Sequence, residues 1–137
     1  MIAVLDTGGV SALAPVDEKT RARLRALRQQ VDDIMLPAAV LAEGLLTGHG
    51  RDHHVRRLLS QLNVLDIDEV LGLSAGRLRA QTIAGGAKPA PSGVDAIVAA
   101  VADAVRGHVQ LVTSDPDDMA ALLIYADHPG QVAILQA

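Results

Sequence analysis

Short apolar segments alternate with longer helix-forming segments along this chain, and this alternation constrains the fold more than any other feature. The short segments have the length and composition of strands and cover residues 2–5, 34–36, 63–66, 109–113 and 131–135. Strands separated by helices are typical of a parallel sheet with helices on both faces. The sequence therefore predicts an α/β fold of three layers, α/β/α, around a parallel sheet of four or five short strands.

The helix-forming segments carry start signals. Asp17 and Glu18 stand at the beginning of one of them, where the helix dipole favours acids, and Asp68 is expected to cap another. Pro37 suits the first position of a third. The predicted helices cover residues 17–29, 37–46, 52–62, 68–83, 93–105 and 117–125, with a helical turn at 10–14 and a loop at 84–92. With 137 residues and no repeat or linker, the chain is expected to form one domain, residues 1–137.

Composition excludes several kinds of chemistry. The chain has no cysteine, which excludes disulfides, zinc–thiolate sites and thiol catalysis. It has no Phe, no Trp and one Tyr, so it lacks the aromatic platforms on which unpaired bases usually stack. No apolar run is long enough for a membrane span or a signal peptide, and we expect a cytoplasmic protein with no membrane contact.

The net charge of −4 argues against non-specific binding of nucleic acid, which depends on Lys and Arg. The basic residues are nevertheless clustered. One segment holds Lys19, Arg21, Arg23, Arg25 and Arg28, and a second holds Arg51, Arg56 and Arg57. These clusters fit either a solvated surface or a contact with RNA or a partner.

Acidic residues stand where the predicted elements begin or end. Asp6 follows the first strand, and Asp115 follows the fourth, with Asp118 one turn into the next helix. Asp95 lies in the first turn of its helix. Glu43 lies in a segment otherwise free of polar side chains, where a buried glutamate needs a partner or a metal. Ligands of open α/β sheets bind outside the carboxyl ends of the strands, which is where this pattern directs the acids.

Each acid also has a purely structural interpretation. Asp6 fits a turn, and Glu43 fits an ion pair with an arginine at the edge of the core. Asp95 fits a capping box with Ser92, and Asp115 fits a helix N-cap. If the carboxylates instead converge at one sheet edge, their repulsion requires compensation. Mg²⁺ or Mn²⁺, which take oxygen ligands, would supply it.

A zinc site is the alternative metal site. His49 and His53 are four residues apart, a spacing that places two imidazoles on one face of a helix. Gly48 and Gly50 flank His49, however, and make a continuous helix doubtful, and the glutamate of a His-Glu-x-x-His motif is missing. We therefore interpret all five histidines as surface or loop residues.

Four segments together resemble the acidic blocks of PIN domains, in order and spacing, over nearly the whole chain. They are Val-Leu-Asp6-Thr, Pro37-Ala-Ala-Val-Leu-Ala-Glu43, Ser92-Gly-Val-Asp95-Ala-Ile-Val-Ala-Ala100 and Leu-Val-Thr-Ser-Asp115-Pro-Asp-Asp118-Met. A short chain with one such domain is similar to the VapC toxins of VapBC toxin–antitoxin pairs. That resemblance implies a Rossmann-like PIN fold, Mg²⁺- or Mn²⁺-dependent endoribonuclease activity on RNA, a homodimer, and a cognate VapB-type antitoxin.

The resemblance also implies roles for individual residues. Asp6 and Asp95 are the principal metal ligands, and Glu43 and Asp115 complete a catalytic quartet. Asp118 matches a further acidic position, as a ligand or a helix cap. Polar positions that contact substrate are matched by Thr7, Thr113 and Ser114. The chain departs from the family pattern at two places without losing a carboxylate: Gly8-Gly9, where Asn or a bulky residue is common, and Met119, where an aromatic residue is usual.

The implied chemistry is hydrolysis of a phosphodiester with metal ions held by the carboxylates. An aspartic protease shares Asp6-Thr7-Gly8, but such enzymes are mainly β and need a second triplet, which is absent. A haloacid dehalogenase phosphatase needs an Asp where Gly8 stands, and a receiver domain needs a late lysine, whereas the only lysines are Lys19 and Lys88. The alternative of another class is a PIN-like binding partner with weak or no nuclease activity, against which the intact acidic set argues.

Overall fold

The computed structural model describes residues 1–137 and contains one five-stranded sheet in which all neighbouring strands run parallel. The strands lie in the order β3-β2-β1-β4-β5. They are β1 (Ile2–Leu5), β2 (Asp33–Pro37), β3 (Asn63–Leu65), β4 (Val109–Thr113) and β5 (Val132–Gln136). The predicted parallel sheet is confirmed, and each predicted strand overlaps an observed one.

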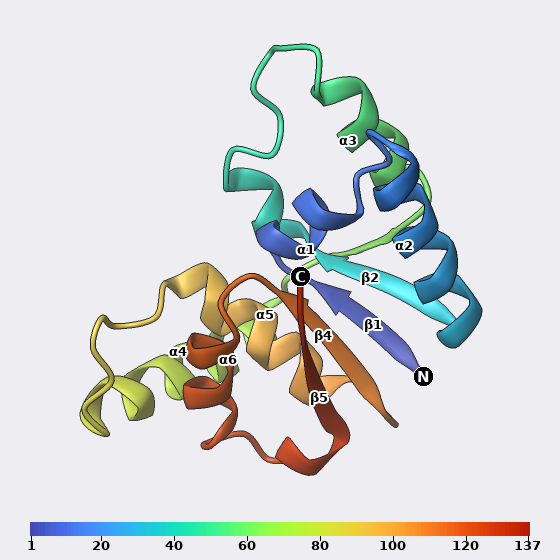
Figure 1. Ribbon diagram of the computed structural model, residues 1–137. Coiled ribbons are helices and arrows are strands. Elements are labelled where there is room, and N and C mark those ends of the chain that lie inside the picture. The colour runs from blue at the N-terminus through green and yellow to red at the C-terminus, as the bar shows by residue number, and fades with distance from the viewer.

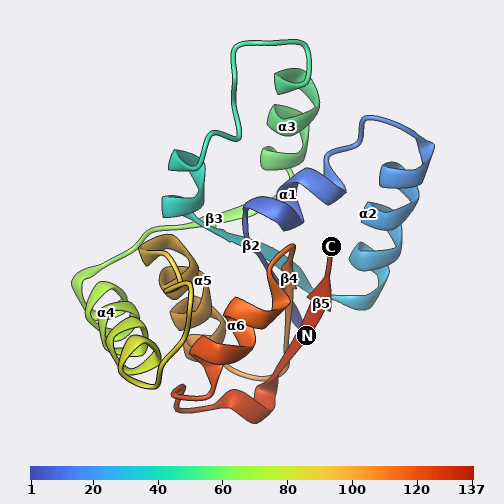
Figure 2. The same cartoon turned by 60° about the vertical axis from the view of Figure 1, so that its left-hand side comes forward.

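Six α-helices cover the two faces of the sheet. On one face α1 (Thr7–Leu13) packs against α2 (Glu18–Gln30) and α3 (Asp52–Leu59), as Figure 1 shows. On the other face α4 (Glu69–Ala84), α5 (Gly93–Ala104) and α6 (Pro116–Leu123) pack together (Figure 2). The predicted three-layer α/β/α architecture is confirmed. None of the helices combines the length and the apolar character needed to cross a membrane.

The core is built from aliphatic side chains around the central strand. Ala3, Val4 and Leu5 of β1 have no exposed surface. The helix α5 contacts β1 and β2 on one side and α4 and α6 on others, so it is apolar nearly all round, as expected for an enclosed helix. Its alanines, such as Ala99, let it approach the sheet closely, which compensates for the lack of large aromatic side chains.

The predicted helix at residues 37–46 is wrong. Pro37 is the last residue of β2 and pairs with Leu65 of β3, after which the chain forms only a short 3-10 helix, η1 (Ala38–Ala42). Gly44 adopts a φ of 76°, which side-chain-bearing residues rarely take, and the chain turns away there. Strand pairing before this segment and the glycine turn after it leave no room for a longer helix. Glu43 therefore lies exposed at the end of η1.

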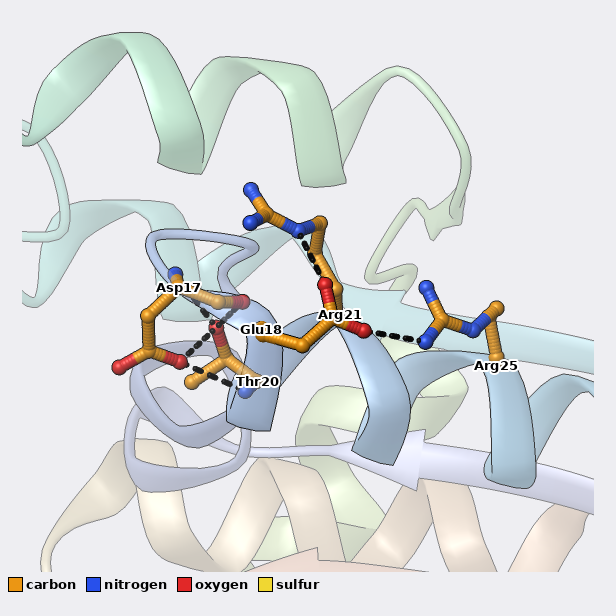
Figure 3. A network of polar contacts seen from close by, with 5 residues as sticks. All are labelled: Asp17, Glu18, Thr20, Arg21 and Arg25. Atoms are coloured by element: carbon orange, nitrogen blue, oxygen red, sulfur yellow. Dashed lines mark hydrogen bonds and ion pairs between the residues drawn. The ribbon is translucent and has the colours of Figure 1, made fainter.

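Aspartates cap the two longest helices, and the cap at Asp68 is the predicted one. The Asp17 carboxylate accepts the backbone N–H of Thr20 at 2.8 Å, and the Thr20 hydroxyl accepts the N–H of Asp17 at 3.1 Å, which forms a capping box at α2 (Figure 3). The Asp68 carboxylate accepts the N–H of Leu71 at 2.9 Å at the start of α4. Because caps of this kind depend on a few neighbouring residues, they could be predicted from the sequence.

Candidate active site

The carboxyl ends of β1 and β4 lie side by side at the centre of the sheet. The chain enters α1 on one face after β1 and α6 on the other face after β4 (Figure 2). Such a reversal of strand order leaves a crevice that is the usual ligand site of an open α/β sheet. A cavity of about 730 Å³ opens here, and four of the predicted acids line it: Asp6, Glu43, Asp95 and Asp115.

Asp6 is the most constrained of these acids. It is only 4% exposed and caps α1, which begins directly after it and earlier than predicted. One carboxylate oxygen accepts the N–H of Gly9 at 2.8 Å, and the other accepts the hydroxyl of Thr113. Burial raises the pKa of Asp6, the bonds from Thr113 and Gly9 oppose that rise, and the charges of Asp95 and Asp115 add to it. Folding thus holds a buried carboxylate where other negative charges gather.

Thr113 joins the two central loops of the site. Its hydroxyl donates to Asp6 and accepts the N–H of Asp115 at 2.9 Å. The side chain is fully buried and lies beneath the cavity, whereas Thr7 and Ser114 lie on the cavity wall. The expected contact of Thr113 with substrate does not fit this position, because neighbouring groups cover the hydroxyl.

Gly8 and Gly9 permit a close approach between the loop after β1 and the end of β4. A Cβ on Gly8 would lie 2.7 Å from the backbone nitrogen of Ser114, and a Cβ on Gly9 would lie 2.6 Å from the carbonyl oxygen of Val112. Neither distance is tolerable for a side chain. The departure from the family pattern at Gly8-Gly9 therefore has a local reason in this chain, which is the tight packing that brings Asp6 next to Thr113.

Asp95 combines a structural role with a place in the cavity. It forms the predicted capping box at α5: its backbone N–H donates to the Ser92 hydroxyl at 3.0 Å, and its carboxylate accepts the N–H of Ser92 at 3.4 Å. The second carboxylate oxygen has no such bond. The half-buried side chain also lines the cavity. Capping and lining the site are therefore compatible for this residue.

Asp115 and Asp118 flank the start of α6. Asp115 occupies the N-cap position, but its side chain makes no capping hydrogen bond, so the predicted cap is wrong, although Pro116 does stand at the first turn. The side chain of Asp115 is exposed on the cavity wall. Asp118 is half-buried and does not line the cavity. Burial, followed by the charges of Asp95 and Asp115, raises the pKa of Asp118, which indicates that it lies near the cluster.

Glu43 reaches the cavity from a position that the sequence did not predict. It stands at the end of η1 as an exposed side chain rather than a buried one on a long helix. The argument that its burial requires a partner or a metal is therefore wrong, because water solvates it. Its place beside the other acids is nonetheless the predicted one.

The donor set of the cavity fits a hard divalent cation. Its acids and hydroxyls offer oxygen, and no histidine lines it. Burial is the main cause of the raised pKa of Asp6, and the charges of Asp95 and Asp115 add to it; this repulsion would favour a bound cation. As the side chains stand, no three acidic or histidine groups are close enough together to hold an ion. The exposed Asp115 and Glu43 would have to turn inward to join Asp6 and Asp95.

Two arginines line the same cavity. Arg23 comes from α2, and Arg51 stands directly before α3. The Arg51 guanidinium donates to the backbone carbonyl of Ser11 at 3.1 Å. The sequence did not indicate Arg51 or Ser11 as site residues. The only signal for Arg51 is its place in the second basic cluster.

The other arginines of α2 have different roles. Arg25 pairs with Glu18 at 2.7 Å, and Arg21 pairs with the same glutamate at 3.4 Å (Figure 3). Arg28 donates to Gln61 near the other end of the helix. Of the first basic cluster, only Arg23 lines the cavity.

The histidines form no metal site. His49 lies in the loop before α3, and His53 lies within that helix, so the pair does not share one helix. No group of three His or acidic side chains is placed to hold an ion anywhere in the chain. The interpretation as surface or loop residues is confirmed for four histidines and is wrong for His54, which is half-buried on α3.

Several solved structures are similar to this fold. One chain of VapBC2 from Rickettsia felis, bound to a DNA fragment from their promoter, matches with a TM-score of 0.72 and 19% identity, over 100% of this chain and 99% of that one. One chain of FitAB bound to an IR36 DNA fragment matches with a TM-score of 0.65 and 22% identity, over 99% of this chain and 94% of that one. One chain of VapBC-1 from nontypeable Haemophilus influenzae matches with a TM-score of 0.66 and 17% identity, over 99% of this chain and 98% of that one. At these identities the likeness is one of fold.

No curated protein matches the sequence. The model of the PIN domain family, however, matches residues 3–122. This segment runs from β1 into α6 and includes every acid that lines the cavity. The resemblance carried by the four acidic blocks is thereby confirmed, and the chain belongs to the PIN domain family.

Proposed function

We propose that this chain is a metal-dependent endoribonuclease that acts as the toxin of a toxin–antitoxin pair. The observation that carries the nuclease proposal is the convergence of Asp6, Asp95, Asp115 and Glu43 on one cavity at the centre of the sheet edge. These acids come from four separate segments of the chain, so local structure alone does not explain why they meet. A shared need for hard cations does.

The acids divide into two that the fold orients and two that are free to move. Thr113 and Gly9 hold Asp6, and the capping box holds Asp95. Asp115 and Glu43 are exposed, and their carboxylates accept no hydrogen bond. We propose Asp6 and Asp95 as the principal ligands of Mg²⁺ or Mn²⁺. Asp115 and Glu43 would complete the ligand set, and Asp118 would add negative charge near it.

Bound divalent ions would supply an activated water and stabilise the charge that develops when a phosphodiester is displaced. The chain itself contributes orientation. Thr113 fixes Asp6 from below, and the close approach at Gly8 fixes the loop of Ser114. Thr7 and Ser114 offer hydroxyls on the cavity wall, where they can donate to phosphate oxygens of the substrate.

The toxin proposal is supported by the solved structures that share the fold. They are VapBC and FitAB assemblies, and this chain covers nearly the full length of each matched chain. We propose a VapB-type antitoxin as the cognate partner, a homodimer as the assembled toxin, and the cytoplasm as the place of action. Induced expression in bacteria should stop growth, and growth should continue with Asp6→Asn, which keeps the fold but loses a charged ligand.

The test of the nuclease is cleavage of a total-RNA or tRNA pool by the purified protein with Mg²⁺, with Mn²⁺ and with EDTA. We expect discrete cuts that need the metal and disappear in Asp6→Asn. The matched control is Asp66→Asn, which removes the same charge from an exposed position outside the cavity. It should cleave like the wild type.

The alternative function is that of a PIN-like binding partner with weak or no nuclease activity. Absence of cleavage by folded protein in the presence of either metal would favour it. Equal cleavage by Asp6→Asn and the wild type would instead point to a contaminating nuclease and remove the support for the acidic site.

A further inference from the structure

Arg23 and Arg51 line the acidic cavity without pairing with any of its acids. Four carboxylates share this cavity, yet no ion pair joins them to either arginine. Arg23 makes no side-chain hydrogen bond at all, and Arg51 makes one, to the carbonyl of Ser11. Most of their guanidinium N–H donors are therefore free, and both side chains are exposed to the open volume.

This placement differs from that of other arginines on the same elements. On α2, Arg25 is held by Glu18 at 2.7 Å, outside the cavity. On α3, Arg57 is exposed and lies outside the cavity as well. Arg57 makes no side-chain hydrogen bond either, so free donors alone do not single out the cavity. What distinguishes Arg23 and Arg51 is that their donors lie on the wall that the acids share.

Arg23 also borders a second hollow. A mostly apolar groove of about 410 Å³ runs beside the acidic cavity, lined by Leu27 of α2 and Leu135 of β5 among others, and Arg23 is common to both. Ala12 and Ala137 also border both hollows, so Arg23 is the one charged side chain beside the path of an RNA strand that passes from the acids towards this groove. Arg51 lies towards α3, where Ser11 orients its guanidinium.

An RNA strand carries a phosphate at every nucleotide, and the acids with their ions can accommodate only the phosphate that reacts. The phosphates on either side need separate positive charges, and guanidinium groups bind phosphate with paired hydrogen bonds. The net charge of −4 provides no general attraction, so local arginines have to supply it.

We propose that Arg23 and Arg51 hold the backbone phosphates that flank the bond to be cut and so position a single strand of RNA across the acids. This role rests on the proposed nuclease function and extends the site from the acids to the basic part of the cavity wall. It predicts contacts with phosphate, which are independent of base sequence.

The experiment measures binding of a fluorescent single-stranded RNA oligonucleotide of mixed sequence by anisotropy, in Mg²⁺ and over a range of salt. Asp6→Asn protein is used so that the RNA stays intact. The Arg23→Ala/Arg51→Ala double variant is compared with the Arg25→Ala/Arg57→Ala double variant in the same background. Both remove two positive charges from the same two regions, and only the first removes them from the cavity.

We expect the first double variant to bind RNA at least about tenfold more weakly than its parent, because charge-assisted hydrogen bonds are lost. The slope of log affinity against log salt should also fall by about 0.7 for each arginine. The Arg25/Arg57 variant should bind like the parent, and both should melt at the parent's temperature. Binding at the same slope by both double variants would overturn the role, as would equal weakening, which would reveal only a general effect of charge.

The two proposals fail in distinguishable ways. If the parent binds no RNA and the wild type cleaves none, the nuclease function and the role of the arginines both fail. If the wild type cleaves RNA as expected while the two double variants bind RNA alike, the nuclease stands and only the role of the arginines is refuted.

Discussion

Replacing Thr113 with valine removes the hydroxyl that joins Asp6 to the amide of Asp115 and keeps the shape of a fully buried side chain. A hydrogen bond to a charged group contributes about 1.5–3 kcal/mol. The amide of Asp115, which is only partly buried, adds about 1 kcal/mol when it loses its acceptor. We therefore expect the free energy of unfolding at neutral pH to fall by about 2.5–4 kcal/mol, a large part of the ~5–15 kcal/mol typical of a domain.

The loss should depend on pH in a direction that the structure sets. Burial already raises the pKa of Asp6, and the Thr113 bond opposes that rise, so valine should raise the pKa further. A raised carboxyl pKa means that stability is lost as pH increases from the ordinary value through the raised one. At low pH the carboxyl is protonated in both states, and the cost of Thr113→Val should shrink to about 2 kcal/mol, about 1 for a neutral hydrogen bond to Asp6 and about 1 for the amide of Asp115.

Urea unfolding of the metal-free protein, at about pH 7 and about pH 4, measures both effects. Thr113→Ser is the matched control, because it keeps the hydroxyl and loses only a methyl group. The reasoning is refuted if valine is no more destabilising than serine at neutral pH. It is equally refuted if the difference between the two variants does not change with pH.

Three further outcomes are expected. Asp6→Asn should raise the unfolding free energy of the metal-free protein at neutral pH, because it removes a buried charge whose pKa is raised. It should also abolish the increase in Tm that Mg²⁺ gives the wild type, and an unchanged Mg²⁺ effect would contradict a metal site at Asp6. Gly8→Ala should lower the free energy of unfolding by about 1–3 kcal/mol and reduce RNA cleavage, because the new Cβ would lie 2.7 Å from the backbone nitrogen of Ser114. Full cleavage by a variant as stable as the wild type would speak against that contact. Asp103→Ala should lower the free energy of unfolding by about 2–4 kcal/mol, measured as a lower urea midpoint, because this buried acid accepts two backbone N–H groups of the loop between α6 and β5. Cleavage per folded molecule should be unchanged, because Asp103 lies outside the cavity.

Much of the fold could be predicted because its elements carry local signals. The β-branched residues of β4 and the caps at Asp68 and Ser92 involve residues that are close in sequence. The segment at residues 37–46 shows where local signals no longer predict the structure. Its apolar pattern suits a helix, but the pairing of Pro37 with Leu65, which lies on another strand, decides the outcome. The order of the strands is likewise a property of the whole chain and has no local signal.

The acids of the site could be predicted, whereas the groups that support them could not. Acids that follow strands of a parallel sheet share one edge whatever the strand order, which is why Asp6 and Asp115 were found. The bond from Thr113 to Asp6 exists only because β4 lies next to β1, and the position of Arg51 depends on how α3 packs against α1. Such contacts join residues far apart in sequence, and no spacing indicates them.

The sequence allows a structural role for each of Asp6 and Asp95, a turn and a capping box respectively, as the rival of metal binding. In the structure both residues cap helices, and capping is compatible with metal binding. An ionised carboxylate has about four acceptor positions. Asp6 uses its two oxygens for one bond each, and Asp95 uses one oxygen for a single bond, so both retain positions for a cation. The capping bonds order these two side chains when the protein folds. Binding of an ion would then have to immobilise only Asp115 and Glu43, which lowers its entropic cost.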